Sequence, residues 1–357
     1  MNAPLLAKPL TLRTADLGDA LERARIGAWV HEQADGTPFH LPAWSIATAR
    51  GCGQRSHYLL AERGNGEIAG VLPLTEIRSP LFGKALVSAG FGVGGGVLAE
   101  HPGAVGQLAD ATWALAQKLG CPGVELRGGL NPGADWTVDD TTYLGFVRPI
   151  AADDDAELLA IPRKQRAEVR RALGFDLEIT TGASAAERAA HYAVYAESVR
   201  NLGTPVFPRA LFAQVLREFD AAADVLTVRH QGQAVASVLS LYWKGVVYPY
   251  WGGGTGEARA LRANDAMYFA LMRHARARGC TRFDFGRSKT GTGAAAFKKN
   301  WGFEGAPLTY FSRSAEGAEK RSVNPLDPKY SRKVEAWKRM PLWLANRLGP
   351  WIARGLG

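Results

Sequence analysis

The chain has 357 residues, of which 46% are hydrophobic and 22% are charged, and its formal net charge at pH 7 is +9. This composition excludes a disordered, collagen-like or coiled-coil protein, and the length is sufficient for two domains. Cys52, Cys121 and Cys280 are far apart, so we expect neither a disulfide framework nor a metal site. We expect a cytoplasmic protein, because the sequence has no signal-peptide pattern and no apolar run of 18 residues.

The first half of the chain predicts a β-hairpin over residues 58–74, because two apolar segments flank a tight turn. A further strand leads to a glycine cluster at residues 90–96, and a helix over 105–119 follows. The helix ends at Gly120-Cys121, where glycine suits the left-handed C′ position, and a strand begins at Val124.

A basic block at residues 163–171 follows an acidic segment and carries a net charge of +4. Arg163, Arg166 and Arg170 have the spacing of one helical face. Three guanidinium groups on one face are suited to a diphosphate, which they bind through paired N–H groups. The alternative is a helix face that contacts only solvent.

The second half repeats the order of the first. It predicts a hairpin over residues 225–241, a glycine cluster at 251–256, a helix over 263–278 and a strand at 283–285. The second helix also ends in Gly-Cys, at Gly279 and Cys280, 159 residues after the first Gly-Cys pair. We interpret this as duplication of one module, although a chance recurrence of a common element order is the alternative.

The second glycine cluster is a candidate ligand-binding loop. Gly252, Gly253 and Gly254 precede a predicted helix and would let backbone approach a ligand. Tyr248 and Tyr250 alternate along the strand before it, so both should point to one face. Both tyrosines are candidate substrate-binding residues, and core packing is the alternative for either one.

The C-terminal segment is basic and rich in tryptophan. Residues 321–357 carry a net charge of +6, and Pro341 and Pro350 should divide residues 333–357 into short helices. Arginine and tryptophan on a short amphipathic helix are typical of an anchor on an anionic membrane surface. The alternative is a helix that packs on the second module with its tryptophans in the core.

Three segments of the chain resemble the FemAB family of peptidyl and aminoacyl transferases. Residues 37–44 resemble its "TPF-x-x-x-x-W" segment, and residues 161–166 resemble the start of its basic helix. Residues 283–286 and 297–303 resemble its "DFG … FK-x-x-x-G" signature. In overall arrangement, the chain resembles in particular the FemAB-like proteins of exosortase (PEP-CTERM) loci, where exopolysaccharide is made.

The resemblance implies an α+β (mixed α/β) fold of two tandem GNAT-like modules. We place the first module at residues 1–155, the second, with the active site, at 156–320, and a basic helical tail at 321–357. It also implies an acyltransferase that modifies an amino group of a peptidoglycan or exopolysaccharide precursor. The acceptor would be nucleotide- or lipid-linked, and the enzyme would work at the inner face of the cytoplasmic membrane.

Site residues follow from the same resemblance. Arg166, with Lys164 and Arg170, would bind phosphates of the acceptor. Lys298 would stabilise negative charge that develops on the transferred group, although a one-residue slip would give this role to Lys299. Asp284 would act as a base or orient a neighbouring group.

The acyl donor is either an aminoacyl-tRNA or an acyl-CoA. An acetyl-CoA site should read Arg/Gln-x-x-Gly-x-Gly/Ala before its helix, whereas residues 259–264 read Arg-Ala-Leu-Arg-Ala-Asn and lack both glycines. This difference argues against the ordinary mode of CoA binding. The remaining alternatives are an acyl-CoA-dependent N-acyltransferase that holds CoA differently, and an inactive tandem module that only binds tRNA or lipid.

Overall fold

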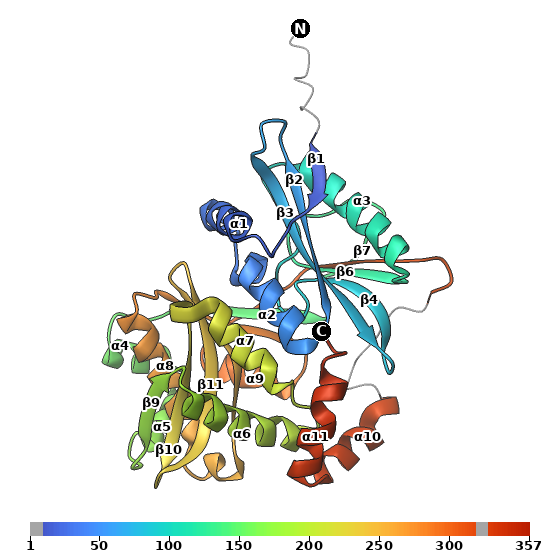
Figure 1. The fold of residues 1–357 in the computed structure, drawn as a ribbon. Helices are drawn as coiled ribbons and strands as arrows, with labels where there is room; N and C mark the ends of the chain where they lie inside the picture. Colours follow the sequence, from blue (N-terminus) through green and yellow to red (C-terminus); the bar gives the residue numbers. More distant parts are fainter. Residues whose placement is uncertain (1–9, 319–327) are drawn as a thin grey trace.

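A computed structural model describes residues 10–318 and 328–357, with the side chains of 10–318 and 331–357. Residues 321–327 of the predicted tail lie outside this range. The described strands form two sheets, stacked as an upper and a lower body in Figure 1.

The first sheet has the order β1-β2-β3-β4-β6-β15-β7, with β5 paired to β3. Its strands are β1 (Thr11–Thr14), β2 (Arg55–Glu62), β3 (Ile68–Ser79), β4 (Gly83–Ser88), β5 (Leu98–Ala99), β6 (Gly123–Arg127), β7 (Thr137–Asp139) and β15 (Tyr310–Ser314). Its helices are α1 (Ala20–Glu32), α2 (Pro42–Cys52) and α3 (Pro102–Leu119), with a short 3₁₀ turn, η1 (Pro38–His40).

The second sheet has the order β14-β8-β13-β12-β11-β10-β9. Its strands are β8 (Tyr143–Pro149), β9 (Glu178–Gly182), β10 (Ala223–His230), β11 (Gln233–Trp243), β12 (Val246–Gly254), β13 (Arg282–Lys289) and β14 (Gly305–Pro307). Around it lie α4 (Asp154–Ala160), α5 (Arg163–Ala172), α6 (Ala185–Asn201), α7 (Arg209–Phe219), α8 (Ala263–Ala277), α9 (Gly293–Asn300), η2 (Asp220–Ala222) and η3 (Gly256–Arg259).

The two sheets share the element order that the sequence predicts for two copies of one module. Each has an antiparallel hairpin followed by one parallel pair, β4 with β6 and β12 with β13. The helices α3 and α8 are each followed by a glycine in the left-handed region, Gly120 (φ 66°) and Gly279 (φ 80°). The mixed α/β fold of two tandem modules is therefore confirmed.

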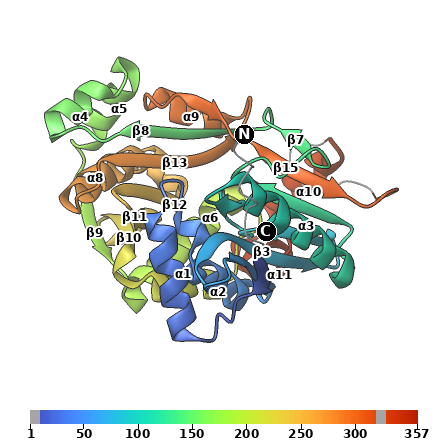
Figure 2. The ribbon, with the colours of Figure 1, turned by 90° about the horizontal axis from the view of Figure 1, so that it is seen from above.

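The two modules exchange strands. β8 precedes the second module in sequence but pairs with β13 and β14 of the second sheet. β15 follows the second module but returns to the first sheet between β6 and β7. Figure 2 shows β8 beside β13 and β15 beside β7. The predicted boundary at residue 155 therefore leaves β8, a strand of the second sheet, within the predicted first module.

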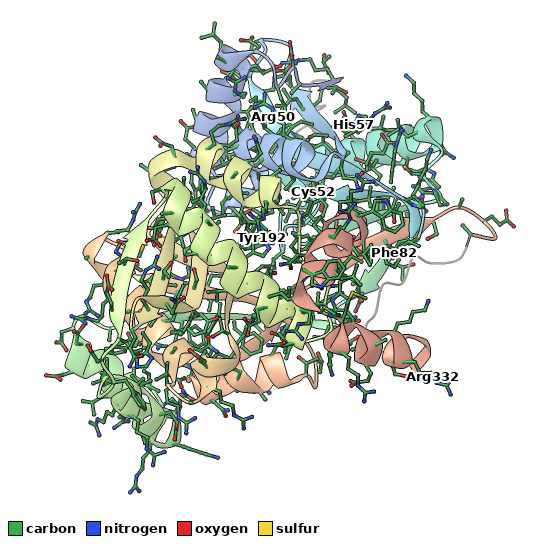
Figure 3. All side chains as sticks on the ribbon, turned by 60° about the horizontal axis from the view of Figure 1, so that its bottom comes forward. Arg50, Cys52, His57, Phe82, Tyr192 and Arg332 are labelled. Atoms are coloured by element: carbon green, nitrogen blue, oxygen red, sulfur yellow. The ribbon has the colours of Figure 1, made fainter. Side chains whose placement is uncertain are left out.

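A single apolar core joins the modules. It combines Trp44 and Phe91 of the first module with Phe212 and Trp251 of the second. The helices α2 and α7 approach closely at Gly51, where a Cβ would lie 2.5 Å from the Cα of Leu211. Cys52 and Tyr192, labelled in Figure 3, belong to this core although they come from different modules. The modules therefore pack together through a shared core.

The tail forms α10 (Pro328–Arg339) and α11 (Leu342–Ala353), which Pro341 separates as predicted. The prediction for Pro350 is wrong, because this residue lies inside α11. The helix α11 packs on α6, and beyond it Gln54 Nε2 donates a hydrogen bond of 2.7 Å to the Arg354 carbonyl. The tail therefore packs on both modules.

Candidate active site

A cavity opens where β12 and β13 part. The two parallel strands pair at Val246 and Val247, near their beginnings, and then diverge. The space between them has a volume of about 340 Å³. Its lining comes from both modules: Phe39, Phe91, Val93, Phe207, Tyr248, Pro249, Tyr250, Trp251, Gly252, Tyr268, Asp284, Phe285, Gly286, Arg287 and Lys298.

Local irregularities in both strands produce this divergence. In β12, Tyr250 is an extra residue, since Pro249 pairs with Ser240 and Trp251 with Leu239. Such a β-bulge bends its strand and re-aims side chains. In β13, Gly286 has a φ of +67°, a conformation that side chains rarely adopt. Its N–H donates a hydrogen bond of 2.9 Å to Asp284 Oδ1.

Lys298 lies in the cavity, on α9, and is buried. Its Nζ donates hydrogen bonds to the carbonyl oxygens of Gly286 (3.1 Å) and Arg287 (2.9 Å), which fixes the bend in β13. Burial lowers the pKa of Lys298 to about 8. Lys299 is exposed and does not line the cavity, so of the two candidate lysines only Lys298 reaches it.

Asp284 faces the same space from β13. Burial raises the pKa of its carboxyl group, which the nearby Lys298 ammonium lowers in part. The cavity thus holds a carboxyl group that is easier to protonate than usual and an ammonium group that is easier to deprotonate. Pairs of this kind are typical of acid–base sites.

Tyr248 and Tyr250 both line the cavity, as their alternation predicted. The Tyr250 hydroxyl donates a hydrogen bond of 2.5 Å to the Phe91 carbonyl and so connects the modules. Burial raises the pKa of both phenols, which therefore stay protonated near neutral pH. No described residue forms a hydrogen bond with the Tyr248 hydroxyl, which leaves it available to a ligand.

Gly252, Gly253 and Gly254 are not a loop, contrary to expectation, because they form the end of β12. They are required by close side-chain packing. A Cβ on Gly253 would lie 2.2 Å from Ser198 Oγ, and one on Gly254 would lie 2.5 Å from the Ala258 Cβ. Of the three glycines, only Gly252 lines the cavity.

The basic helix α5 lies outside the cavity lining. Arg166 donates hydrogen bonds to the carbonyls of Ile161 (3.1 Å) and Leu159 (2.9 Å), so it satisfies the C-terminal end of α4. Lys164 and Arg170 are exposed. The structure therefore does not bring these three residues together with Lys298 and Asp284.

The segment before α8 also differs from a phosphate-binding loop. The Gly256 N–H donates a hydrogen bond of 2.7 Å to Glu197 Oε1, so a carboxylate already occupies this donor. Arg262 forms an ion pair of 2.6 Å with Glu168. Both features reduce the attraction of this segment for a pyrophosphate.

The corresponding space in the first module is filled. After the parallel pair of β4 and β6, Arg127 donates hydrogen bonds to Ser88 Oγ through its backbone N–H (2.7 Å) and to the Gly92 carbonyl through Nη1 (2.9 Å). A Cβ on Gly96 would lie 1.8 Å from the Gly128 oxygen, so the backbones are in direct contact. Among the cavities described, the one between diverging strands belongs to the second module.

Other polar groupings lie away from the cavity. His191 Nδ1 is 3.0 Å from Ser237 Oγ, but both residues are fully buried, so a substrate cannot reach them. Within residues 10–318 and 331–357, no group of three His, Cys, Asp or Glu side chains is placed to hold a metal. In the same part of the chain, no helix is long and apolar enough to cross a membrane.

Comparison with known proteins agrees with this geometry. Residues 162–299 match the family model of the acetyltransferase (GNAT) domain. The chain has a GNAT fold. No curated protein matches the sequence. The domain match confirms the expected acyltransferase class.

Solved structures are similar in fold to nearly the whole length of this chain. FemX is similar with 15% identity and a TM-score of 0.65 over 85% of this chain and 97% of FemX. L-PGS from Bacillus licheniformis has 13% identity and a TM-score of 0.53, over 89% of this chain and 97% of its own. A tandem GNAT protein from the clavulanic acid biosynthesis pathway has 14% identity and a TM-score of 0.52, over 87% of this chain and 100% of its own. These likenesses concern the fold.

Several cavity residues were not predicted. Arg287 lies directly after the predicted "DFG" segment, yet its neighbours Tyr143 and Tyr310 come from β8 and β15. Phe39 lies in a segment that resembles the FemAB pattern, and Phe91 lies in the first glycine cluster, but neither pattern assigns a role to the aromatic ring. Only the packing of the modules places them in the cavity.

Proposed function

We propose that the protein is an acyltransferase of FemAB type that transfers an aminoacyl or acyl group to an amino group of a cell-envelope precursor. The observation that carries the proposal is the cavity between β12 and β13, which holds Lys298 and Asp284 among aromatic side chains. An acceptor related to peptidoglycan or, as in exosortase-associated systems, to exopolysaccharide is consistent with the sequence resemblance.

The chemistry requires an uncharged amine and a polarised carbonyl. The amine nitrogen forms a bond to the donor carbonyl carbon, and the bond from that carbon to the leaving oxygen or sulfur breaks. In our proposal, Asp284 accepts a proton from the acceptor ammonium before attack. The positive charge of Lys298 stabilises the oxyanion of the tetrahedral intermediate. As the bond to the leaving oxygen or sulfur breaks, the attacking nitrogen loses its second proton and the leaving group takes one up, so that an amide and a free hydroxyl or thiol result.

We favour an aminoacyl-tRNA as the donor over an acyl-CoA. The support is the segment before α8, where the glycines of a CoA site are lacking and Glu197 and Glu168 occupy the Gly256 N–H and the Arg262 guanidinium. An acyl-CoA-dependent N-acyltransferase is the main alternative.

The basic face of α5 is proposed to bind phosphates of the donor or of a nucleotide-linked acceptor. Arg163, Lys164 and Arg170 are exposed and form no ion pair with the described residues. Two of the preceding acidic residues have partners elsewhere, since Asp154 pairs with Arg273 at 2.7 Å and Glu157 pairs with Arg148. This leaves α5 cationic. Arg166 would act there mainly by holding α5 against the end of α4.

Transfer assays test the proposal directly. Purified protein is given a pool of tRNA charged with labelled amino acids, or labelled acetyl-CoA, together with nucleotide-linked muropeptide or amino-sugar acceptors. The proposal predicts label in an amide product from charged tRNA. Transfer from acetyl-CoA alone would support the N-acyltransferase alternative, and binding of tRNA or lipid without transfer by any donor would indicate an inactive module.

We also propose that the tail contacts the anionic inner face of the cytoplasmic membrane. The helix α11 buries its small residues Ala345, Gly349 and Ala353 and turns Trp343 and Trp351 outward, with exposures of 69% and 46%. Among the described residues, these are the two exposed tryptophans. An exposed aromatic face is typical of a membrane-interface helix.

Basic residues accompany this face. Arg347 and Arg354 are exposed and have helical spacing with Trp343 and Trp351. Arg332, labelled in Figure 3, is exposed on the adjacent helix α10. Cationic side chains beside aromatic ones favour an anionic lipid surface. A membrane-bound enzyme would meet a lipid-linked acceptor without leaving the surface.

A further inference from the structure

Arg287 has an unusual position in the cavity. It follows the bend at Gly286, and its Nη1 donates a hydrogen bond of 2.7 Å to the Tyr310 hydroxyl. Its guanidinium carbon lies 4.7 Å from the centre of the Tyr143 ring and 5.6 Å from that of Tyr310. The Tyr310 hydroxyl in turn donates a hydrogen bond of 2.7 Å to the Val93 carbonyl. The guanidinium is thus held between aromatic rings at the seam of the two modules.

No carboxylate of the described residues forms an ion pair with Arg287. Three other arginines of low exposure do have such partners: Arg127 with Glu125, Arg148 with Glu157, and Arg229 with Glu187. A charge in low-dielectric surroundings is costly unless it is paired. The acidic residue of the cavity, Asp284, accepts the Gly286 N–H and lies by Lys298. The cavity therefore carries an excess of positive charge.

The donors that remain determine the class of ligand. A guanidinium has five N–H groups in a planar fork, and a protein acceptor is recorded for one of them. Lys298 already uses two N–H groups on the carbonyls of Gly286 and Arg287. A guanidinium fork can bind a carboxylate or a phosphate through two N–H groups. Because Arg287 and Lys298 share the cavity with the carboxyl group of Asp284, its one excess positive charge matches a carboxylate monoanion better than a phosphate dianion.

We propose that Arg287 binds a carboxylate group of the substrate. The inference deepens the proposed function, and on that function the carboxylate belongs to the acceptor, because the carboxyl group of the donor is consumed in its ester or thioester. The acceptor would then be an amino-acid-like or peptide-like group that carries a carboxylate near the amine. Arg287 would fix this group while the amine points toward the donor carbonyl.

The test uses the whole chain and measures binding rather than transfer, by ligand-observed NMR. The probes are N-acetyl-L-alanine, its uncharged amide and methyl phosphate. The amide differs from N-acetyl-L-alanine in its charge, and none of the three is an amine or an acyl donor. The result is therefore independent of whether the protein is a transferase.

We expect the wild-type protein to bind N-acetyl-L-alanine at least about tenfold more tightly than the amide. Arg287→Gln should abolish this preference, and Arg287→Lys should retain part of it. Arg282→Gln, on the exposed start of the same strand, should leave it unchanged. If Arg287→Gln is unstable, Tyr310→Phe serves as the second variant. It keeps the guanidinium and removes only its hydroxyl partner, so it should weaken the preference for the acid without abolishing it.

Equal binding of the acid and the amide by the wild-type protein would overturn the proposal, as would a preference that persists in Arg287→Gln. Tighter, Arg287-dependent binding of methyl phosphate would show that the ligand class is wrong. If the carboxylate preference is found but no transfer occurs, the site stands and the proposed function fails.

Discussion

The guanidinium of Arg287 and the hydroxyl of Tyr310 lie 2.7 Å apart, although one belongs to the second sheet and the other to a strand that has returned to the first. The Tyr250 hydroxyl makes a similar connection to the Phe91 carbonyl. Both contacts lie at the wall of the cavity. The candidate active site is therefore a product of both modules, even though the diverging strands belong to the second.

The pH dependence of transfer should be bell-shaped. Activity should fall above about pH 8, because burial lowers the pKa of Lys298 to about 8 and its ammonium is lost there. It should also fall in acid, as Asp284 becomes protonated at a pH above its ordinary pKa, which burial raises. Lys298→Arg should move the alkaline limb upward, since a guanidinium keeps its proton. A limb that stays near pH 8 in this variant would assign it to another group.

Gly253→Ala should destabilise the fold by about 1–3 kcal/mol, because the new methyl group would overlap Ser198 Oγ at 2.2 Å. Urea denaturation measures the loss. Adding Ser198→Gly to the Gly253→Ala variant should restore part of the lost stability, because it removes the overlapping hydroxyl. The glycine in α6 has its own cost, which the single variant Ser198→Gly measures. Gly293→Ala is the matched control, since no atom lies within 4 Å of its Cβ position. Equal effects at Gly253 and Gly293 would contradict the packing argument.

Glu157→Ala should cost about 3–5 kcal/mol of unfolding free energy, because it leaves the Arg148 guanidinium buried without its partner. Glu157 is fully buried and also accepts the Ala151 N–H at 2.8 Å, so it fixes the segment that joins β8 to α4. Asp155→Ala removes an exposed carboxylate of the same helix and should change stability by less than about 0.5 kcal/mol. A small effect at Glu157 would show that β8 is held mainly by its strand pairing.

Membrane binding should depend on the outward face of α11. In co-sedimentation with vesicles containing about one-third phosphatidylglycerol, Trp343→Ala with Trp351→Ala should reduce the bound fraction several-fold, with little change in thermal stability. Pure phosphatidylcholine vesicles should bind less, owing to the loss of attraction to Arg347 and Arg354. Leu21→Ala, an exposed apolar residue on α1, controls for a general loss of surface hydrophobicity. Unchanged sedimentation of the double variant would exclude this face as the anchor.

The sequence predicted what depends on local pattern. The hairpins and the Gly-Cys helix ends follow from turns, capping and repetition. The pairing of β15 with β6 was not predicted, because it joins segments far apart in the chain and no local signal specifies the partner. Arg287 was missed for the same reason, since Tyr143, Tyr310 and Val93 reach it only through that exchange. Gly252–Gly254 were misassigned to a loop because glycine in a strand, here required by Ser198 and Ala258, has the same sequence signal.

In our proposal, acyl transfer takes place between β12 and β13. The most direct measurement compares the transfer rate of the wild-type protein with those of Lys298→Ala and Lys299→Ala, using the donor that the assays identify, and checks each variant's folding by circular dichroism. Because Lys298 lies in the cavity and Lys299 faces solvent, we predict a loss of about a hundredfold or more for Lys298→Ala and no change for Lys299→Ala. Full activity of a folded Lys298→Ala variant would exclude this cavity as the site of transfer.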